Sequence, residues 1–326
     1  MADLASIIAS NVNGSLPTPG RIQPGAYIET WKDLFGLSFP AGAETEPVAR
    51  SEAQQAELQA YLDSPEHVRD REKLLEHIRG SRVLELGSGS GSMLELISAG
   101  HHNLSMLVGV EFSPYFFQHA AAKLFADKAR NGDAQIFLVR GDVTQTSITP
   151  SFFDTAVMTS IVHEIKSLYG VAAVENIFEN VYGGLAPGGS LVVYDGFRRP
   201  DEDARLQLHT AYSSERFDEY VAARNGELAL SYEADEVILP VSDAVEFATK
   251  LQASEGWDVE LREDYYPFSL AQYRGILEDI GFRIEVKTFS EEIDQSALAE
   301  HITVHNYATG ANELTAHHNA LIVARK

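Results

Sequence analysis

The sequence predicts an α/β fold: a doubly wound, mostly parallel sheet of seven strands, with an N-terminal helical cover and an inserted lid. Short apolar segments alternate with helical patterns from Arg82 to Asp195, and this alternation is typical of βαβ units on a parallel sheet. The alternation stops after Asp195 and resumes at Ser269. The interruption therefore predicts a segment inserted into one enlarged domain.

The composition excludes several functional classes. Of the 326 residues, 44% are hydrophobic, enough to bury a core, and the formal net charge is −23. A surface this acidic repels phosphate groups, which argues against nucleic acid or an anionic membrane as a partner. The absence of cysteine excludes disulfides, zinc–thiolate sites and cysteine nucleophiles. No apolar run approaches ~18 residues and no signal-peptide pattern opens the chain, so we expect a cytoplasmic protein.

The predicted elements divide the chain into four parts. Residues 1–80 form the helical cover, which contains a helix that begins at Ser64-Pro65 and stops at Gly80, because serine caps helices, proline suits the first turn and glycine suits the end. Residues 81–199 form the cofactor half of the core, 200–268 the lid or substrate-recognition segment, and 269–326 the completion of the core. Strands are predicted at Arg82–Leu86, Met106–Glu111, Gln135–Arg140, Phe153–Thr159, Ser190–Asp195, Glu236–Leu239, Arg283–Thr288 and Ala320–Arg325. Helices are predicted at Ser113–Arg130, Val171–Leu185, Asp203–Asn225, Ser242–Gln252 and Ser269–Ile280.

A glycine-rich turn follows the first strand. The strand runs into Gly87-Ser88-Gly89-Ser90-Gly91 and then into a helical pattern. Glycine in such a turn lets a cofactor approach bare backbone and permits positive φ angles. The dinucleotide fingerprint requires another glycine three residues after its second one, where this chain has Ser92. The spacing therefore favours a cofactor that lacks a pyrophosphate.

Acidic residues stand at the ends of the next two strands. Glu111 ends the second strand, and a carboxylate at this place can accept hydrogen bonds from ribose hydroxyls. Asp142 follows the third strand, where it can accept a hydrogen bond from an adenine amino group. A tight turn, Ala186-Pro187-Gly188-Gly189, precedes the fifth strand. Each motif is common, and it is their order along the chain that indicates a nucleoside cofactor.

With these motifs in register, residues Arg82–Asp195 and Ser269–Lys326 resemble the class I S-adenosylmethionine-dependent methyltransferases. The resemblance implies their Rossmann-like fold, S-adenosylmethionine as the cofactor, and methyl transfer as the activity. It implies that Glu85 and the glycine loop hold the methionine and ribose, that Glu111 holds the ribose beside Phe112, and that Asp142 contacts the adenine. The predicted cofactor-binding residues are Glu85, Gly87, Ser88, Gly89, Gly91, Glu111, Phe112, Asp142, Val143 and Ser160.

The methyl acceptor is expected outside the carboxyl ends of the strands. His163 follows the fourth strand and is the predicted catalytic residue, a general base for a hydroxyl or an amine, because the ordinary pKa of histidine lies near working pH. The alternative is a histidine that opens a helix and packs under the cofactor. The residues predicted to bind the acceptor are Asp195, Tyr265, Tyr266, His301 and His305.

Two features of the later chain have competing interpretations. His301 and His305 lie four residues apart on a predicted helix, a spacing that can chelate a metal, or they line the acceptor pocket, or they belong to a solvated loop. No metal is predicted, because the metal-dependent catechol-type members of the family use acids and an amide where this chain has Ser160 and Asp195-Gly196. Aromatic residues of the lid either stack on the acceptor or attach the lid to the core. These are Tyr212, Trp257, Tyr265, Tyr266 and Phe268.

The predicted function is methyl transfer from S-adenosylmethionine to an oxygen or nitrogen of a small molecule or peptide. Alignment of the two substrates can supply much of the rate of such a displacement. Two alternatives stay open: the same cofactor site used for aminopropyl transfer or a cyclisation, and a non-catalytic binding module. The sequence does not indicate the oligomeric state.

Overall fold

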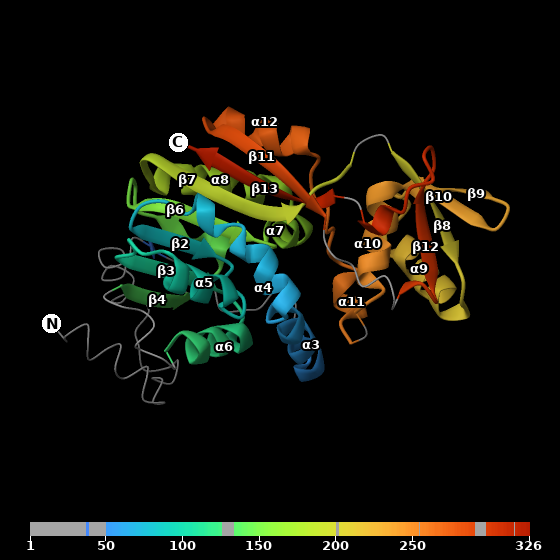
Figure 1. Cartoon of the computed structure of the whole chain (residues 1–326), viewed down its shortest axis with the longest axis horizontal. Coiled ribbons are helices and arrows are strands. Elements are labelled where there is room, and N and C mark those ends of the chain that lie inside the picture. The colour runs from blue at the N-terminus through green and yellow to red at the C-terminus, as the bar shows by residue number, and fades with distance from the viewer. Residues whose placement is uncertain are drawn as a thin grey trace.

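The computed structural model describes residues 37–38, 50–125, 134–199, 202–253, 255–290, 298–315 and 317–326 (Figure 1). The apolar residues Trp31, Leu34, Phe35 and Phe39 of the N-terminal segment lie outside the described residues. Among the described helices, none is long and apolar enough to cross a membrane.

The main sheet has seven strands in the order β11-β13-β7-β6-β2-β3-β4. Strands β4, β3, β2, β6 and β7 are parallel, and β13 runs antiparallel to both of its neighbours. This order confirms the predicted doubly wound, mostly parallel sheet. The bounds are β2 (Arg82–Leu86), β3 (Met106–Glu111), β4 (Gln135–Arg140), β6 (Phe153–Thr159), β7 (Leu185–Gly196), β11 (Arg283–Ser290) and β13 (His317–Arg325).

Helices cover both faces of this sheet, as its alternating side chains require. Leu84 and Leu86 of β2 point into one apolar cluster with α7, α8 and α12, whereas Val83 points into another with α5. Because neighbouring side chains of a strand point to opposite faces, a strand that is apolar throughout must be covered on both sides. The helices are α5 (Ser92–Gly100), α6 (Pro114–Phe125), α7 (Val162–Tyr169), α8 (Val171–Gly184) and α12 (Leu270–Ile280).

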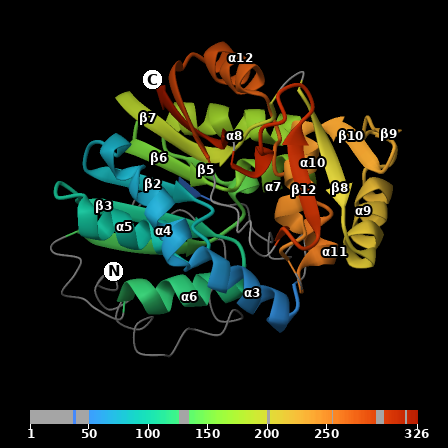
Figure 2. The same cartoon turned by 45° about the vertical axis from the view of Figure 1, so that its right-hand side comes forward.

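Two N-terminal helices lie beside the carboxyl ends of the strands. Helix α4 (Pro65–Glu72) begins as predicted, with Ser64 as its N-cap and proline in its first turn, but it ends at Glu72, short of the predicted end at Gly80. Helix α3 (Glu52–Leu62) was not predicted, and it buries no residue that could have produced an apolar stripe. It lies between α6 and the inserted helix α11 (Trp257–Glu260) (Figure 2). The Gln54 side chain donates to Asp258 at 2.7 Å, and Gln59 accepts from Tyr115 of α6 at 2.7 Å.

The inserted segment forms a second sheet with its own core. The sheet is antiparallel, with strand order β12-β8-β10-β9, and Figure 1 shows it beside the end of the main sheet to which β7 points. An apolar cluster separate from those of the main sheet fills this unit. Its elements are β8 (Asp203–Leu208), β9 (Ser231–Glu233), β10 (Glu236–Pro240), β12 (Ile302–Asn306), α9 (Ala211–Ala223) and α10 (Val241–Lys250).

Two sequence predictions about this region are wrong. The helix predicted over Asp203–Asn225 begins only at Ala211, because residues 203–208 alternate between buried and exposed side chains and form β8. The helix predicted to carry His301 and His305 is the strand β12, which pairs with β8. Residues 269–326 therefore complete the main sheet and also supply one strand of the inserted sheet.

The strand β8 gives a test of the second core. Leu206 is fully buried in it, so Leu206→Ala should lower the free energy of unfolding of the inserted unit by ~2–5 kcal/mol through lost burial and a cavity. Tyr232→Ala on β9, where the side chain is 66% exposed, should change it by less than about 0.5 kcal/mol. Urea unfolding followed by Trp257 fluorescence, with Trp31 replaced by Phe, measures both. Equal effects of the two substitutions would contradict the strand assignment.

Candidate functional site

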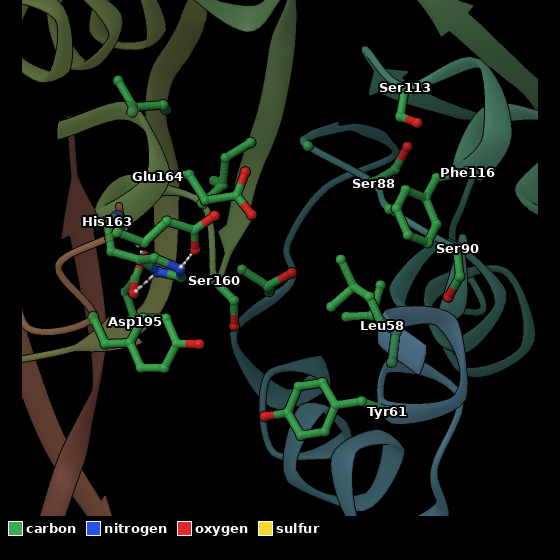
Figure 3. Close-up of a pocket in the computed structure, with 18 of the residues that line it drawn as sticks. Leu58, Tyr61, Ser88, Ser90, Ser113, Phe116, Ser160, His163, Glu164 and Asp195 are labelled. Atoms are coloured by element: carbon green, nitrogen blue, oxygen red, sulfur yellow. Dashed lines mark hydrogen bonds and ion pairs between the residues drawn. The ribbon is translucent and has the colours of Figure 1, made fainter. Parts of the chain in front are cut away.

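A cavity of about 430 Å³ opens at the carboxyl ends of the parallel strands. The ends of β2, β3, β4, β6 and β7 form its floor, α3 and α4 line one side, and the inserted unit lines another (Figure 3). Of the predicted site residues, those that line it are Glu85, Gly87, Ser88, Gly89, Glu111, Phe112, Asp142, Val143, Ser160, His163, Asp195, Tyr265 and Tyr266.

The glycine loop turns sharply between β2 and α5. Gly87, Gly89 and Gly91 have φ angles of 74°, 51° and 82°, which disfavour other residues. A Cβ on Gly87 would lie 2.0 Å from Ile161 Cδ1, and one on Gly91 would lie 2.9 Å from Ala120 Cβ. Gly91 does not line the cavity; it is the N-cap of α5 packed against α6. At these two positions glycine serves close packing of the fold.

Two buried carboxylates lie beside this loop. Glu111 is 7% exposed, and its two oxygens accept the N–H groups of Gly89 at 2.7 Å and Ser113 at 2.8 Å. Glu85 is 1% exposed, and its Oε2 atom has no hydrogen-bond partner among the described residues. Burial raises the pKa of Glu85 well above its usual value, and the charge of Glu111 adds to this. A buried acceptor without a donor is costly, so this position is suited to a ligand that donates a proton or carries positive charge.

At the end of β4, Asp142 is held by its own turn. One carboxylate oxygen accepts the N–H and the hydroxyl of Thr144, at 2.8 and 2.7 Å, and the other accepts from the Gln145 amide at 3.2 Å. These bonds cap the short helix Val143–Gln145. The carboxylate is fixed at the rim of the cavity, together with Val143 and Phe112.

Helix α7 and strand β7 bring His163 and Asp195 together. The His163 Nδ1 atom lies 2.7 Å from Asp195 Oδ1, while Asp195 Oδ2 accepts the N–H groups of Val162 at 2.8 Å and His163 at 3.3 Å. Asp195 is 3% exposed and also accepts the Gly196 N–H. Its oxygens thus accept hydrogen bonds from the protein and hold the His163 ring in place, while Asp195 also lines the cavity, so acceptor binding by this residue stays a prediction.

Two glutamates face the other side of the His163 ring. The Nε2 atom of His163 lies 3.7 Å from Glu263 Oε2, and Glu164 points into the cavity beside it (Figure 3). Burial alone would lower the pKa of His163, but the charge and hydrogen bond of Asp195, reinforced by Glu263, raise it well above its usual value. Burial and the charge of Glu263 raise the pKa of Glu164 to about 8. At neutral pH His163 therefore holds its proton, which argues against the free imidazole base predicted from the sequence.

The two tyrosines of the lid have different places. Tyr265 donates a hydrogen bond to Glu260, and its ring meets the His163 ring edge-on at 5.5 Å. Tyr266 is 2% exposed and packs in the core of the inserted unit. Of the other lid aromatics, Phe268 is buried in an apolar cluster of the main sheet and attaches the lid to the core, whereas Trp257 is buried in the inserted unit's own cluster.

The histidines predicted at the acceptor pocket lie elsewhere. His301 precedes β12 and lies beside Tyr212, with ring centroids 5.4 Å apart, and His305 is within the strand. Neither lines the cavity. Residues four apart on a strand are about 13 Å apart, at ~3.3 Å per residue, so the two rings cannot share a metal. His317 begins β13, and nothing is described of its side chain.

Three cavity residues had no sequence signal. Arg71 of α4 is 4% exposed and donates to Ser160 Oγ at 3.4 Å, and Ser160 itself has a φ angle of 51°. Tyr61 of α3 and Glu263 of the inserted unit also line the cavity. Arg71, Tyr61 and Glu263 belong to segments without a recognisable motif. Their place at the cavity is therefore visible only in the tertiary structure.

Comparison with protein families supplies the decisive observation. A family model described as a methyltransferase domain matches residues 84–191. Residues 84–191 of this chain therefore form a methyltransferase domain. The matched residues run from within β2 to within β7 and include the glycine loop and the acidic strand ends.

Solved structures share the fold of this methyltransferase domain. A methyltransferase from Haloferax volcanii, in complex with the Trm112 methyltransferase activator, has a TM-score of 0.51 and 15% identity, over 85% of this chain and 99% of that chain. An S-adenosylmethionine-dependent methyltransferase from Mesorhizobium loti has a TM-score of 0.48 and 20% identity, over 81% of this chain and 100% of that chain. A protein from Nostoc punctiforme described as an O-methyltransferase has a TM-score of 0.47 and 13% identity, over 84% of this chain and 60% of that chain. No curated protein matches the chain.

The cavity histidine His67 gives a pH-dependent test of the site. Burial, with the charge of Arg71, lowers the pKa of His67 to about 2, so the folded protein keeps this ring neutral. The unfolded chain takes up a proton below pH 6.5, the ordinary value, and the free energy of unfolding falls as the pH falls through that point. At pH 5 the loss due to His67 should be about 2 kcal/mol.

Urea unfolding at pH 7.5 and pH 5.0 checks this. The His67→Gln variant should lose about 2 kcal/mol less than the wild type between these two pH values. An identical loss in both proteins would show that His67 is not held neutral by the fold.

Proposed function

We propose that this methyltransferase transfers a methyl group from S-adenosylmethionine to an oxygen or nitrogen of a small molecule or peptide bound in the cavity. The observation that carries the proposal is the buried Glu85 oxygen that lacks a donor, at the floor of a cavity between the glycine loop and His163. The methionine part of the cofactor has an ammonium group that would supply the missing donor and positive charge.

The cofactor-binding residues follow from their places around the cavity. Glu85 and the glycine loop would hold the methionine part, with Ser160 nearby, and the buried cation Arg71 would face its carboxylate. Glu111, at the end of β3, would accept hydrogen bonds from the ribose hydroxyls. Residues expected beside the adenine are Phe112, Asp142 and Val143. S-adenosylmethionine supplies an electrophilic methyl group when bound.

The acceptor would lie where the inserted unit meets α7. His163, Tyr265 and Glu263 line that end of the cavity, and the inserted unit covers it, which excludes water from the reacting groups. Asp195 fixes the orientation of the His163 ring, so that its Nε2 atom faces the acceptor space. The chain's own contribution to the rate is then chiefly the alignment of donor and acceptor.

Glu111→Ala tests the cofactor assignment. The substitution removes a charge-assisted acceptor for the ribose hydroxyls, so it should weaken S-adenosylmethionine binding by ~2–3 kcal/mol in isothermal titration calorimetry. Glu111→Gln, which keeps one oxygen acceptor, should lose less. Glu175→Ala, at an exposed position of α8, is the matched control and should bind as the wild type does. Unchanged affinity in Glu111→Ala, or equal binding of a nicotinamide dinucleotide, would contradict the assignment.

The product identifies the reaction. Incubation with S-adenosylmethionine carrying a labelled methyl group and a metabolite extract should yield a product heavier than its precursor by one labelled methylene, found by mass spectrometry. The Glu111→Ala protein is the control and should give little of it. A product that gains an aminopropyl group, or a cyclised cofactor, would replace methyl transfer with the alternative reactions.

A further inference from the structure

Three side chains at the acceptor end of the cavity face one another with atoms suited to a metal ion. His163, Glu164 and Glu263 each offer one ligand atom, and these three atoms all lie within 4.8 Å of one another. Two of them come from the first turn of α7 and the third from the inserted unit. The sequence analysis predicted no metal, and it did not consider Glu263, which lies a hundred residues from His163 and belongs to no motif.

His163 and Glu263, the two more buried ligands, each form a hydrogen bond to a residue outside the cluster. In each case the bond engages one nitrogen or oxygen of the side chain, and the second nitrogen or oxygen faces the cluster. Asp195 engages His163 at Nδ1, 2.7 Å away, so Nε2 faces Glu263. Arg50 donates to Glu263 Oε1 at 3.0 Å, so Oε2 faces His163. Carboxylate–histidine–metal arrangements and hydrogen-bonded ligating carboxylates are the usual surroundings of protein metal sites.

The third ligand has no competing partner. Among the described residues, the Glu164 carboxylate makes no hydrogen bond and no ion pair, and Figure 3 shows it pointing into the cavity beside His163. Glu164 and Glu263 thus place two carboxylates at the side of one imidazole, where the protons held by His163 and Glu164 offset the charge and a metal cation would displace them. Such an arrangement is unfavourable unless a cation or protons neutralise it.

We propose that His163 Nε2 and the carboxylates of Glu164 and Glu263 bind one divalent transition-metal cation, of the kind that Mn²⁺ and Zn²⁺ represent. One imidazole nitrogen with two carboxylate oxygens is a donor set that these ions accept. Three protein ligands leave coordination positions for an exogenous oxygen, and these positions face the acceptor space. The inference rests on the ligand geometry and stands or falls separately from the proposed methyl transfer.

Titration of the full, tag-free chain with Mn²⁺ tests the site directly. Electron paramagnetic resonance of unbound Mn²⁺ should show one ion bound per chain, and Zn²⁺ should displace it. Asp195→Asn, which alters the partner of the His163 ring and keeps one oxygen to accept backbone N–H groups, should weaken binding 10–100-fold. Glu164→Gln and Glu263→Gln remove a ligand and should weaken it by more than about 100-fold, because a ligand contributes more than its outer partner. Glu164→Gln should not lower the melting temperature, since that carboxylate has no hydrogen bond to lose and lies beside the like charge of Glu263.

Glu260→Gln is the matched control. Glu260 lines the same cavity, but its carboxylate accepts a hydrogen bond from Tyr265 and is not one of the three ligands. This variant should bind Mn²⁺ within about threefold of the wild type, because it changes charge and not a ligand. Three outcomes would overturn the proposal: no binding by the wild type at 1 mM Mn²⁺, full binding by Glu164→Gln, or an equal loss in Glu260→Gln. Loss of methyl transfer with intact metal binding would count only against the proposed function.

Discussion

The buried carboxylate of Asp195 is the point at which the main sheet, helix α7 and the cavity meet. It accepts the backbone N–H groups of Val162, His163 and Gly196 and the ring of His163. These donors offset the cost of burying a charge, and they also satisfy the first N–H groups of α7, which has no side-chain cap of its own. This contact fixes His163, at the start of α7, to the end of strand β7 in the seven-stranded sheet.

The position of the inserted unit depends on a different kind of contact. Its apolar cluster is separate from those of the main sheet, and polar pairs join the two. Arg198 forms two hydrogen bonds to Asp243, at 3.0 and 3.1 Å, and Lys166 of α7 contacts Asp264 at 2.7 Å. In this pair, Asp264 follows Glu263 in the chain, and Lys166 lies three residues after His163 in α7. The distance between Glu263 of the inserted unit and His163 of α7 is therefore set by these polar pairs, because no single apolar cluster spans the inserted unit and the main sheet among the described residues.

The sequence predicted the parts of this molecule whose signals are local. Strands β2, β3, β4 and β6 begin and end at the predicted residues, because each is a short apolar run bounded by polar or turn-forming residues. The glycine loop and the acidic strand ends were found for the same reason: the fold requires particular residue types at fixed places along one segment. The predicted cofactor residues other than Gly91 line one cavity as a result.

Contacts between distant segments could not be predicted in this way. Glu263, Arg71 and Tyr61 reach the cavity because of how whole segments pack, and the residues around them form no pattern. The segment that carries His301 and His305 was predicted to be a helix, but His301 precedes the strand β12 and His305 lies within it. The pairing of β12 with β8 settles its conformation, and that partner lies about a hundred residues earlier in the chain.

The path of β12 also has a consequence for how the chain folds. Three strands of the inserted sheet are complete by Pro240, but the edge strand β12 belongs to the connection between β11 and β13, the last two strands of the main sheet. During synthesis the inserted sheet must wait for this late segment, and until then β8 is an open edge with unpaired backbone groups. The last strands of both sheets are thus added at the same late stage. Residues 200–268 alone would lack β12, so this segment does not contain the complete inserted sheet.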